Sequence, residues 1–469
     1  MVRIPLFSAL VCLALVLSAP PQTRAQGGQP PTADAEPPLV AAVKKQDLGV
    51  VKALLSRGEK PNVRDHWGHQ TPLLVAVQGG NPVFIRLLLD RGADSNYDNI
   101  DGQTPLMAAA GRGDLALVKL LLTKGARVQA REGSSLPPEL ARGIGNRTVL
   151  MWGVMGGNAD VVRLLLARGA DPNARDKNNW TPLIWASSRG RSDLFALLTA
   201  RGARLNIGQD GFLAMDEAAR AKHLEMVRYL LKRGISPNTH NDSGFSVLMN
   251  TAIGGDATLL RLLLDNGGDV KARTRFLETP LTLAALNGRT ACARLLLERH
   301  ADIQGKNDRG ETALNLAAQQ GHAETVALLL ERGAETETKD KVGATALLHA
   351  ALQGHTDCVK ALLDRGADPN VSLLSGETVL MATADGGAPV EIARLLLDKG
   401  VRLNAGDKDG ATALMYAAYR GKADFVRLLL AKGADVNARD NAGATALTAA
   451  TRGGHNDIVM LLKEAGAKE

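Results

Sequence analysis

The stretch Thr279-Pro-Leu-Thr-Leu-Ala-Ala-Leu-Asn-Gly288, followed by Leu295-Leu-Leu297 and a second turn, recurs along almost the whole chain of 469 residues. Thirteen copies can be counted, and their starts are usually 33 residues apart. A fixed period of this length is typical of a stack of similar small units, each of which buries its apolar face against its neighbours. The repeat therefore predicts one continuous array of helical units, although the length alone would suggest about three globular domains.

The pattern inside each copy predicts two helices. Leu stands at the third position of the opening motif in twelve copies, and a small residue always follows three positions later. This spacing puts both on one helical face, where the small residue lets a neighbouring helix approach closely. Thr suits the N-cap and Pro the first helical position. Two glycines, such as Gly113 and Gly125, suit left-handed helix ends; Gln46 and Lys222 replace the first glycine in two copies, and His300 replaces the second in one.

The twelfth copy shows the full pattern: Thr412-Ala-Leu414, Gly421, Leu428-Leu-Leu430 and Gly433-Ala-Asp-Val-Asn437. These residues resemble the ankyrin repeat, and the resemblance covers about residues 37–467. It implies an all-α solenoid of thirteen stacked helix-turn-helix units with short finger loops. It also implies that the variable positions line a concave face, built from the first helices and the fingers, that binds other proteins.

One departure from the ankyrin pattern is consistent. The family usually has His directly after the opening Leu, and no copy here does. Met or Leu stands at that position in seven copies: Leu74, Met107, Met151, Met249, Leu348, Met381 and Met415. The Thr–His hydrogen bond that the resemblance implies is therefore absent, and we expect an apolar contact in its place.

Residues 1–25 have the layout of a secretory signal peptide. Arg3 supplies the positive charge, Ile4 to Leu17 the apolar core, and Thr23-Arg-Ala25 a small-residue cleavage context. The core is shorter than an ordinary membrane-spanning helix, although an uncleaved anchor is an open alternative. We therefore expect an exported protein, periplasmic or secreted, with a disordered leader at residues 26–36 and no membrane span in the mature chain.

The mature chain contains two cysteines, Cys292 and Cys358, which occupy the same slot of copies two repeats apart. Stacked helices lie about 8–10 Å apart, so about 20 Å separates the two thiols. A disulfide needs Cα atoms within about 7 Å. We therefore expect no bridge between them, and two buried thiols that act as small apolar residues.

The repeat pattern is interrupted once by extra residues. Repeat starts are 44 residues apart between Thr104 and Thr148, which places an insertion at about residues 131–146. Insertions of this kind often lie on the binding face of a repeat protein. A tolerated surface loop is an equally open interpretation.

The sixth copy, residues 213–238, is degenerate. It lacks the Thr-Pro opening and carries Lys222 in the first glycine slot. A left-handed residue with a side chain costs about 1 kcal/mol, and the stability of a linear array is a sum over its units and interfaces. We therefore expect this copy to open first, between about residues 202 and 234.

The net charge of +7 does not indicate nucleic-acid binding, because most of the excess has a structural explanation. Lys or Arg precedes the second glycine in eleven of thirteen copies, where a cation offsets the dipole of the second helix. A second slot, five residues earlier, is basic in ten copies and is often preceded by an acid at helical spacing. We expect no nucleic-acid partner.

The sequence offers no catalytic or metal-binding motif. His66-Trp-Gly-His69 could suggest a metal, but no Cys or acid at ligand spacing completes the set. No glycine-rich phosphate loop and no Gly-x-Ser-x-Gly nucleophile motif is found. Thirteen repeats leave no room for a separate catalytic domain, so we expect no enzyme activity, no cofactor and no metal.

Binding residues are expected in slots that vary among the copies, because the fold does not dictate them. Aromatic residues gather in these slots in repeats four to seven, close to Arg side chains and the insertion, and aromatic–Arg groups are the usual anchors of protein interfaces. Local packing between helices is the alternative for Trp152 and Trp185. The candidates are Trp152, Trp180, Trp185, Arg189, Phe212 and Phe245, with a second group formed by Tyr419 and Arg420.

The favoured interpretation is a monomeric, non-catalytic scaffold that binds a protein or peptide. Two alternatives remain open. The first is carbohydrate or cell-wall recognition, with Trp180 and Phe212 as stacking platforms for sugar rings. The second is an accessory protein that shields or delivers an exported enzyme.

Overall fold

The computed structural model describes residues 36–65, 68–133, 145–206 and 208–468. The expected signal peptide, nearly all of the expected leader and most of the 131–146 insertion lie outside these residues. The described residues contain 26 α-helices and no strand, apart from four isolated antiparallel bridges. The prediction of an all-α fold is confirmed.

The chain divides into two compact units, Met1–Asp94 and Ser95–Glu469. The described part of the first unit contains two helix pairs, in which α1 packs against α2 and α3, and α3 packs against α4. The bounds of these helices are α1 (Pro38–Lys44), α2 (Leu48–Ser56), α3 (Pro72–Gly79) and α4 (Pro82–Asp90).

The second unit continues the same arrangement through residue 464. The first helices of its repeats are α5 (Pro105–Gly111), α7 (Val149–Gly156), α9 (Pro182–Ser188), α11 (Gln209–Arg220), α13 (Val247–Gly254), α15 (Pro280–Leu286), α17 (Ala313–Gln319), α19 (Ala346–Leu352), α21 (Val379–Asp385), α23 (Ala413–Tyr419) and α25 (Ala446–Gly453). The second helices are α6 (Leu115–Thr123), α8 (Ala159–Ala167), α10 (Ser192–Ala200), α12 (Leu224–Lys232), α14 (Ala257–Asp265), α16 (Thr290–Glu298), α18 (Ala323–Glu331), α20 (Thr356–Asp364), α22 (Val390–Asp398), α24 (Ala423–Ala431) and α26 (Asn456–Glu464).

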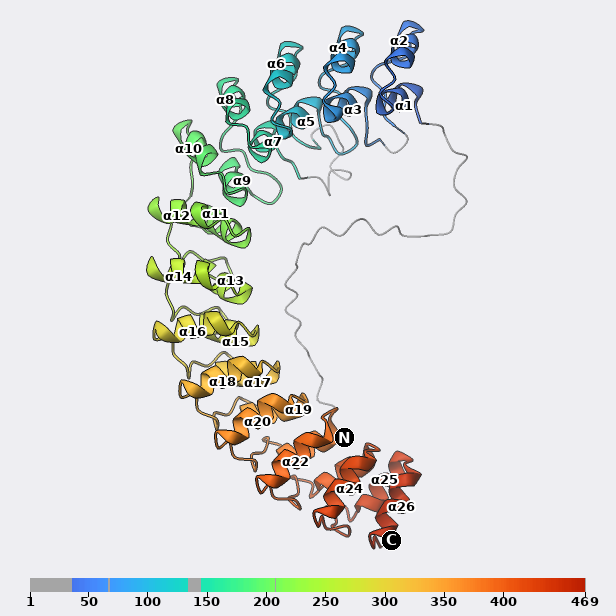
Figure 1. The fold of residues 1–469 in the computed structure, drawn as a ribbon, viewed down its shortest axis with the longest axis vertical. Coiled ribbons are helices and arrows are strands. Elements are labelled where there is room, and N and C mark those ends of the chain that lie inside the picture. Colours follow the sequence, from blue (N-terminus) through green and yellow to red (C-terminus); the bar gives the residue numbers. More distant parts are fainter. Residues whose placement is uncertain (1–35, 66–67, 134–144, 207, 469) are drawn as a thin grey trace. The chain divides into compact units, whose positions relative to one another are not determined.

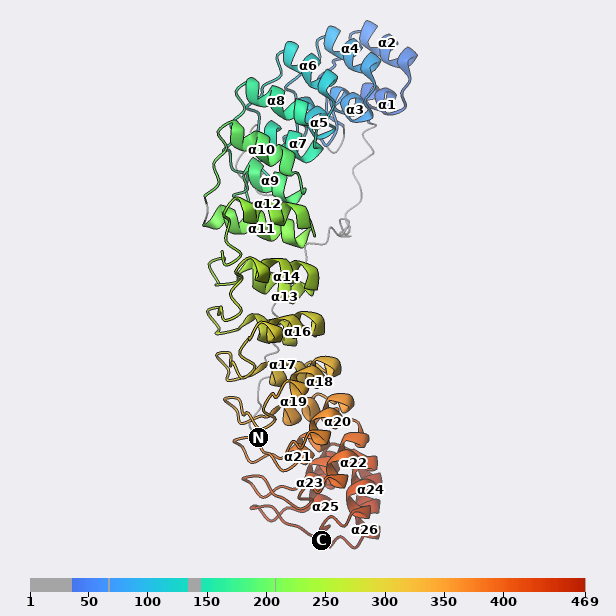
Figure 2. The same ribbon diagram turned by 60° about the vertical axis from the view of Figure 1, so that its left-hand side comes forward.

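The core of the second unit lies between consecutive repeats. Each first helix packs against its own second helix and against the first helices of the neighbouring repeats within this unit. Figure 1 shows these helix pairs following one another in chain order, and Figure 2 shows the loops between repeats projecting to one side of the helices in the C-terminal part of the unit. In the eighth repeat Leu281, Ala284 and Leu296 are completely buried. The small Ala lets neighbouring helices approach closely, as its position in the motif predicted.

The expected capping of the first helices is confirmed. The Thr71 side chain accepts a hydrogen bond from the Leu74 N–H, and Pro72 takes the first helical position. Equivalent Thr or Ser caps recur in ten further repeats, at Thr104, Thr148, Thr181, Ser246, Thr279, Thr312, Thr345, Thr378, Thr412 and Thr445. The degenerate sixth repeat lacks such a cap, because Gly208 precedes its first helix.

The residue after the opening Leu also accepts hydrogen bonds in several repeats, in addition to the expected apolar contact. In three repeats the backbone N–H of the capping Thr donates to a Met sulfur at 3.4 Å: Met151, Met381 and Met415. In repeats eight and nine Thr282 and Asn315 accept the same N–H through oxygen. Because thioether sulfur is a weak hydrogen-bond acceptor, methionine retains part of the polar contact while filling the apolar space. The expectation of a purely apolar replacement is corrected accordingly.

The three residues that replace glycine at helix ends adopt the left-handed conformation. Gln46 has φ 56°, Lys222 has φ 59° and His300 has φ 62°. One glycine departs from the expected pattern, because Gly386 ends α21 in an extended conformation with φ −79° and ψ −170°. Four residues separate α21 from α22, whereas three separate most helix pairs, and the extra residue lets the chain turn without a left-handed glycine.

The two cysteines are free and completely buried. Burial raises the pKa of Cys292 to about 11, and nearby Asp256 raises it further than Arg289 lowers it. Burial also raises the pKa of the Cys358 thiol to about 11. Both side chains therefore remain neutral thiols at ordinary pH and pack as small apolar groups.

The sixth repeat is unusual in its packing as well as in its sequence. Its first helix, α11, is 12 residues long, whereas those of the flanking repeats have seven and eight. Second helices contact one another along most of the second unit, but α12 packs less closely against α10 and α14 than other neighbours do. A looser interface contributes less to the stability of a linear array, which supports the prediction that this repeat opens first.

Replacement of Lys222 by Gly should stabilise the sixth repeat by about 0.5–1 kcal/mol. The substitution removes the steric cost of a left-handed side chain, which exceeds the added entropy of the unfolded glycine. Amide hydrogen exchange and limited proteolysis between residues 202 and 234 should both slow. The matched control is Lys119→Gly in the exposed middle of α6, which should destabilise by about 1 kcal/mol. Similar losses in the two variants, or cleavage confined to residues 26–36 and 131–146, would contradict the prediction.

Candidate functional site

Repeats four and five bring together three of the predicted aromatic residues. Trp152 lies on α7, Trp180 lies directly before the Thr cap of α9, and Trp185 lies on α9. The rings of Trp180 and Trp185 meet edge to face, with centroids 4.8 Å apart. All three side chains are half-buried. The glycine at position 111 makes room for Trp152, because a Cβ there would lie 2.8 Å from the indole ring.

Arg147 links the tryptophans of the two repeats. Its guanidinium carbon lies 4.8 Å from the ring centroid of Trp152 and 5.9 Å from that of Trp185. These distances are within the range of cation–π attraction. We call Arg147, Trp152, Trp180 and Trp185 the tryptophan cluster. It lies on the side of the repeats formed by the first helices and the loops that precede them.

Two carboxylates fix the orientation of the tryptophan cluster. Glu132 accepts hydrogen bonds from Arg147 Nε at 2.8 Å and from Trp152 Nε1 at 3.1 Å. Asp176 accepts one from Trp185 Nε1 at 3.0 Å. Both acids are buried, so each contact satisfies a polar group that has little access to water. The indoles of Trp152 and Trp185 are therefore held in place before any partner arrives.

The remaining candidates of repeats five to seven are less closely grouped. Arg189 caps the C-terminal end of α9 with an exposed side chain, and Phe245 is half-buried directly before the Ser cap of α13. We expected Phe212 to be exposed, and this expectation is wrong, since its side chain is only 5% exposed. The helix α11 starts before Phe212, whereas α9 and α13 start after the equivalent residues, so the helix turns this aromatic ring into the core.

The second predicted group lies at the end of α23. Tyr419 is 44% exposed, and the Arg420 guanidinium carbon is 5.8 Å from its ring centroid. Arg420 also donates from Nε and Nη2 to the two carboxylate oxygens of Asp385, at 2.7 and 3.1 Å. This bidentate pair joins repeats eleven and twelve, so Arg420 has a structural contact while Tyr419 presents an open aromatic face.

A loop acid that the sequence interpretation overlooked positions several of these side chains. One oxygen of Asp176 accepts the N–H groups of Asn178 and Trp180, and the other binds the Trp185 indole. The same arrangement recurs where Asp340 meets His349 and where Asp407 meets the Tyr416 hydroxyl. The sequence contains a pattern that could have identified this acid. A short polar residue, most often Asp or Asn, recurs five positions before the capping Thr or Ser: Asn99, Asp176, Asn241, Thr274, Asn307, Asp340, Asp407 and Asp440.

The pair formed by Asp340 and His349 differs from the other examples, because a second carboxylate lies beside it. The carboxylate of Glu311, from the preceding repeat, lies within 4.8 Å of the Asp340 and His349 ligand atoms. The His349 Nε2 atom is 2.9 Å from Asp340 Oδ2. Burial raises the pKa of Asp340, but hydrogen bonds from His349 and the backbone outweigh it and hold this pKa below its usual value. These three side chains could hold a metal ion.

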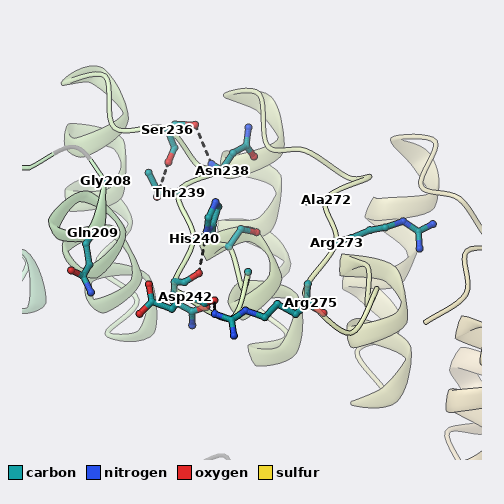
Figure 3. A pocket seen from close by; sticks show the side chains of 14 residues that line it. Gly208, Gln209, Ser236, Asn238, Thr239, His240, Asp242, Ala272, Arg273 and Arg275 are labelled. Carbon is teal, nitrogen blue, oxygen red and sulfur yellow. Dashed lines mark hydrogen bonds between the residues drawn. The ribbon is translucent and has the colours of Figure 1, made fainter. Parts of the chain in front are cut away.

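The loops between repeats six and eight form an open polar groove, shown in Figure 3. None of the predicted binding residues lines it. Its arginines contact neighbouring loops: Arg273 Nη1 donates to the Lys306 carbonyl at 3.0 Å, and Arg275 donates to the Asp242 carbonyl. These cross-repeat hydrogen bonds give the arginines a structural role in joining adjacent loops.

Arg147→Met should destabilise repeats four and five by about 2 kcal/mol, because the Glu132 side chain, 5% exposed, would lose its cationic partner. Urea unfolding followed by tryptophan emission measures the effect. The control is Arg163→Met, which breaks the exposed pair with Asp160 and should change stability by less than about 0.5 kcal/mol. Adding Glu132→Gln to Arg147→Met should recover part of the loss. Equal effects of the two Arg variants would show that Arg147 does not hold the cluster together.

Comparison with known proteins identifies the repeat. The family model for ankyrin repeats in three copies matches residues 39–132, 150–241, 217–307, 248–340, 301–373, 349–440 and 380–469. The chain is also similar to Zygote-specific protein 3 of Chlamydomonas reinhardtii, with 44% identity over 59 residues. That match covers 13% of this chain and 15% of the length of the algal protein.

No match to the family model covers the residues between 132 and 150, where the insertion was expected. Among the helices of the described residues, none has both the length and the apolar character needed to cross a membrane. Together the matches cover residues 39–132 and 150–469, which is well over half of the chain. The chain belongs to the ankyrin repeat family.

Proposed function

We propose that this protein is a non-catalytic binding scaffold whose protein or peptide partner docks on the first-helix side of repeats four and five. Ankyrin repeats generally mediate protein–protein interaction. The observation that supports this site is the tryptophan cluster of three half-buried indoles and Arg147. Two buried carboxylates hold Arg147 and the indoles of Trp152 and Trp185, and the Trp180 ring packs against Trp185.

The cluster has the physical properties of an interface anchor. Trp and Arg dominate the binding energy of many protein interfaces when they lie in well-packed, partly desolvated positions. Here the Glu132 and Asp176 hydrogen bonds fix the rings of Trp152 and Trp185, so a partner would not have to order these two rings on binding. Arg189, exposed at the end of α9, can extend the contact, and Tyr419 provides a second and more distant aromatic contact.

The carbohydrate alternative loses one of its two stacking platforms, because Phe212 is buried. Trp180 alone presents a smaller surface for a sugar ring, since its neighbour Trp185 packs against it edge to face. A protein partner can use the indoles, the arginines and the adjacent loops together. Service as an accessory to an exported enzyme is one form of the same protein-binding role.

We also propose that the protein is exported to the periplasm or the medium. The support is the signal-peptide layout of residues 1–25, with a positive start, an apolar core and a small-residue cleavage context. An exported scaffold without a disulfide between Cys292 and Cys358 must be stable through packing alone.

The Trp180→Ala/Trp185→Ala variant should lose the partner while keeping the helical circular dichroism of the parent protein. The test places a photo-cross-linking amino acid at position 189, which is exposed at the end of α9, and irradiates cells of the native host. The protein attached to this position is then identified by mass spectrometry. We expect at least a tenfold loss of the adduct, because interface anchors typically contribute 2 kcal/mol or more.

The control for this experiment is Tyr229→Ala, which removes a half-buried aromatic residue from the second helix of repeat six. It should leave the adduct unchanged, since α12 lies outside the proposed surface. An adduct that survives the double Trp substitution would refute the site. Binding to a glycan array that depends on the tryptophans, without any protein adduct, would favour the carbohydrate alternative instead.

Export should produce a mature chain that begins at Gln26. Intact mass and N-terminal sequencing of the protein from the native host measure this directly. The substitution Leu15→Arg, which places a charge in the apolar core of the signal sequence, should abolish cleavage and retain the protein in the cytoplasm. A full-length chain with Met1 in the cytoplasm of the parent strain would contradict the proposal.

A further inference from the structure

Two carboxylates with little exposure in repeats nine and ten lack the Lys or Arg partner that several other buried acids of this protein have. Glu132, Asp210 and Asp216 each lie within 3.0 Å of an arginine nitrogen. Glu311 is 4% exposed, and the Asp340 side chain is 5% exposed. Among the described residues, neither has an ion pair with Lys or Arg.

The contacts of these two acids leave part of their charge unbalanced. Glu311 Oε2 accepts a hydrogen bond from the Asn307 amide at 2.8 Å. Asp340 Oδ1 accepts two backbone N–H groups, while its Oδ2 faces His349 Nε2. Since two buried carboxylates repel each other and pay a desolvation cost, a cation between them would stabilise the fold.

We propose that Glu311, Asp340 and His349 form a binding site for a divalent transition metal of the Zn²⁺ type. The ligand atoms are one carboxylate oxygen of Glu311, Oδ2 of Asp340 and Nε2 of His349. Imidazole nitrogen and carboxylate oxygen are both Zn²⁺ ligands, and three protein ligands leave a fourth tetrahedral position for water. The site is distinct from the tryptophan cluster and does not depend on the proposed partner.

The geometry of the cluster suits such an ion. The three ligand atoms lie within 4.8 Å of one another. Metal–ligand bonds of about 2.0–2.1 Å in a tetrahedron require ligand atoms about 3.3 Å apart, so side-chain movements of about 1.5 Å are sufficient. Asp340 is already held by the N–H groups of Val342 and Ala344, which orient its free oxygen. Hydrogen bonds that orient a ligand in this way are typical of metal sites.

The metal would join two repeats through residues that the linear sequence keeps apart. Glu311 precedes the capping Thr of repeat nine, whereas His349 lies on α19 of repeat ten and Asp340 in the loop before it. Bound Zn²⁺ would have to replace the hydrogen bond between His349 and Asp340, with the imidazole proton on Nδ1. The ion would then connect neighbouring loops, which are otherwise joined at this place by the Lys341 N–H and the Arg309 carbonyl.

The test uses the full purified chain, stripped with EDTA and titrated with ZnCl₂ against a chromophoric chelator. We expect one Zn²⁺ per chain, confirmed by native mass spectrometry. His349→Ala and the isosteric Glu311→Gln should each weaken binding by about 100-fold or more, since even the loss of a side chain that only hydrogen-bonds to a metal ligand costs about 10–100-fold. Zn²⁺ should also slow amide hydrogen exchange at residues 340–349 in the parent protein.

Two controls separate this site from adventitious binding. Glu377→Gln removes the equivalent acid beside the Asp407–Tyr416 pair, where no imidazole is present, and should leave Zn²⁺ binding unchanged. His66→Ala/His69→Ala removes both histidines of the His66-Trp-Gly-His69 stretch and should also have no effect. If this double variant loses the Zn²⁺ while Glu311→Gln retains it, or if no stoichiometric Zn²⁺ binds, the proposed site is wrong. Glu311→Gln preserves side-chain size, so its circular dichroism should match that of the parent.

Discussion

The close stacking of each first helix on the next is the constraint on which this structure depends. Most helices have only seven to nine residues, and a single pair of such helices cannot bury enough apolar surface to be stable alone. The small residue in each opening motif permits the close approach, and Leu281 and Ala284 show the result, since both are completely buried. Stability is therefore local, and a defect such as the looser packing of α12 has its main effect on adjacent repeats.

Stacking also brings residues of neighbouring repeats together at regular positions. The residue before the capping Thr in one repeat lies close to the loop acid and the first helix of the next. Arg147 meets Trp185 in this way, and Glu311 meets His349. One geometry thus produces a cationic aromatic cluster in repeats four and five and a carboxylate–imidazole cluster in repeats nine and ten. The side chains at these few positions, rather than the backbone, distinguish one part of the array from another.

Several features of the candidate site could be predicted from the sequence, and others could not. The variable slots identified Trp152, Trp180 and Trp185, which do lie near one another. The same reasoning failed for Phe212. The first helix of the degenerate repeat starts early, and this turns the Phe212 side chain into the core. It also overlooked Glu132 and Asp176, although a short polar residue recurs in the loops. The expectation of no metal site depended on ligands close together in the sequence, whereas Glu311 and His349 are 38 positions apart.

The sequence by itself determined the repeat period, the helix pairs, the caps and the left-handed ends at Gln46, Lys222 and His300, because each depends on contacts within a few residues of the same copy. Only the tertiary structure decided which side chains of different copies meet and which slots are buried. Those outcomes depend on the exact start of each helix and on distances across the repeat interface. A shift of one residue turns a helical side chain by about 100°, so exposure cannot be inferred from the slot alone.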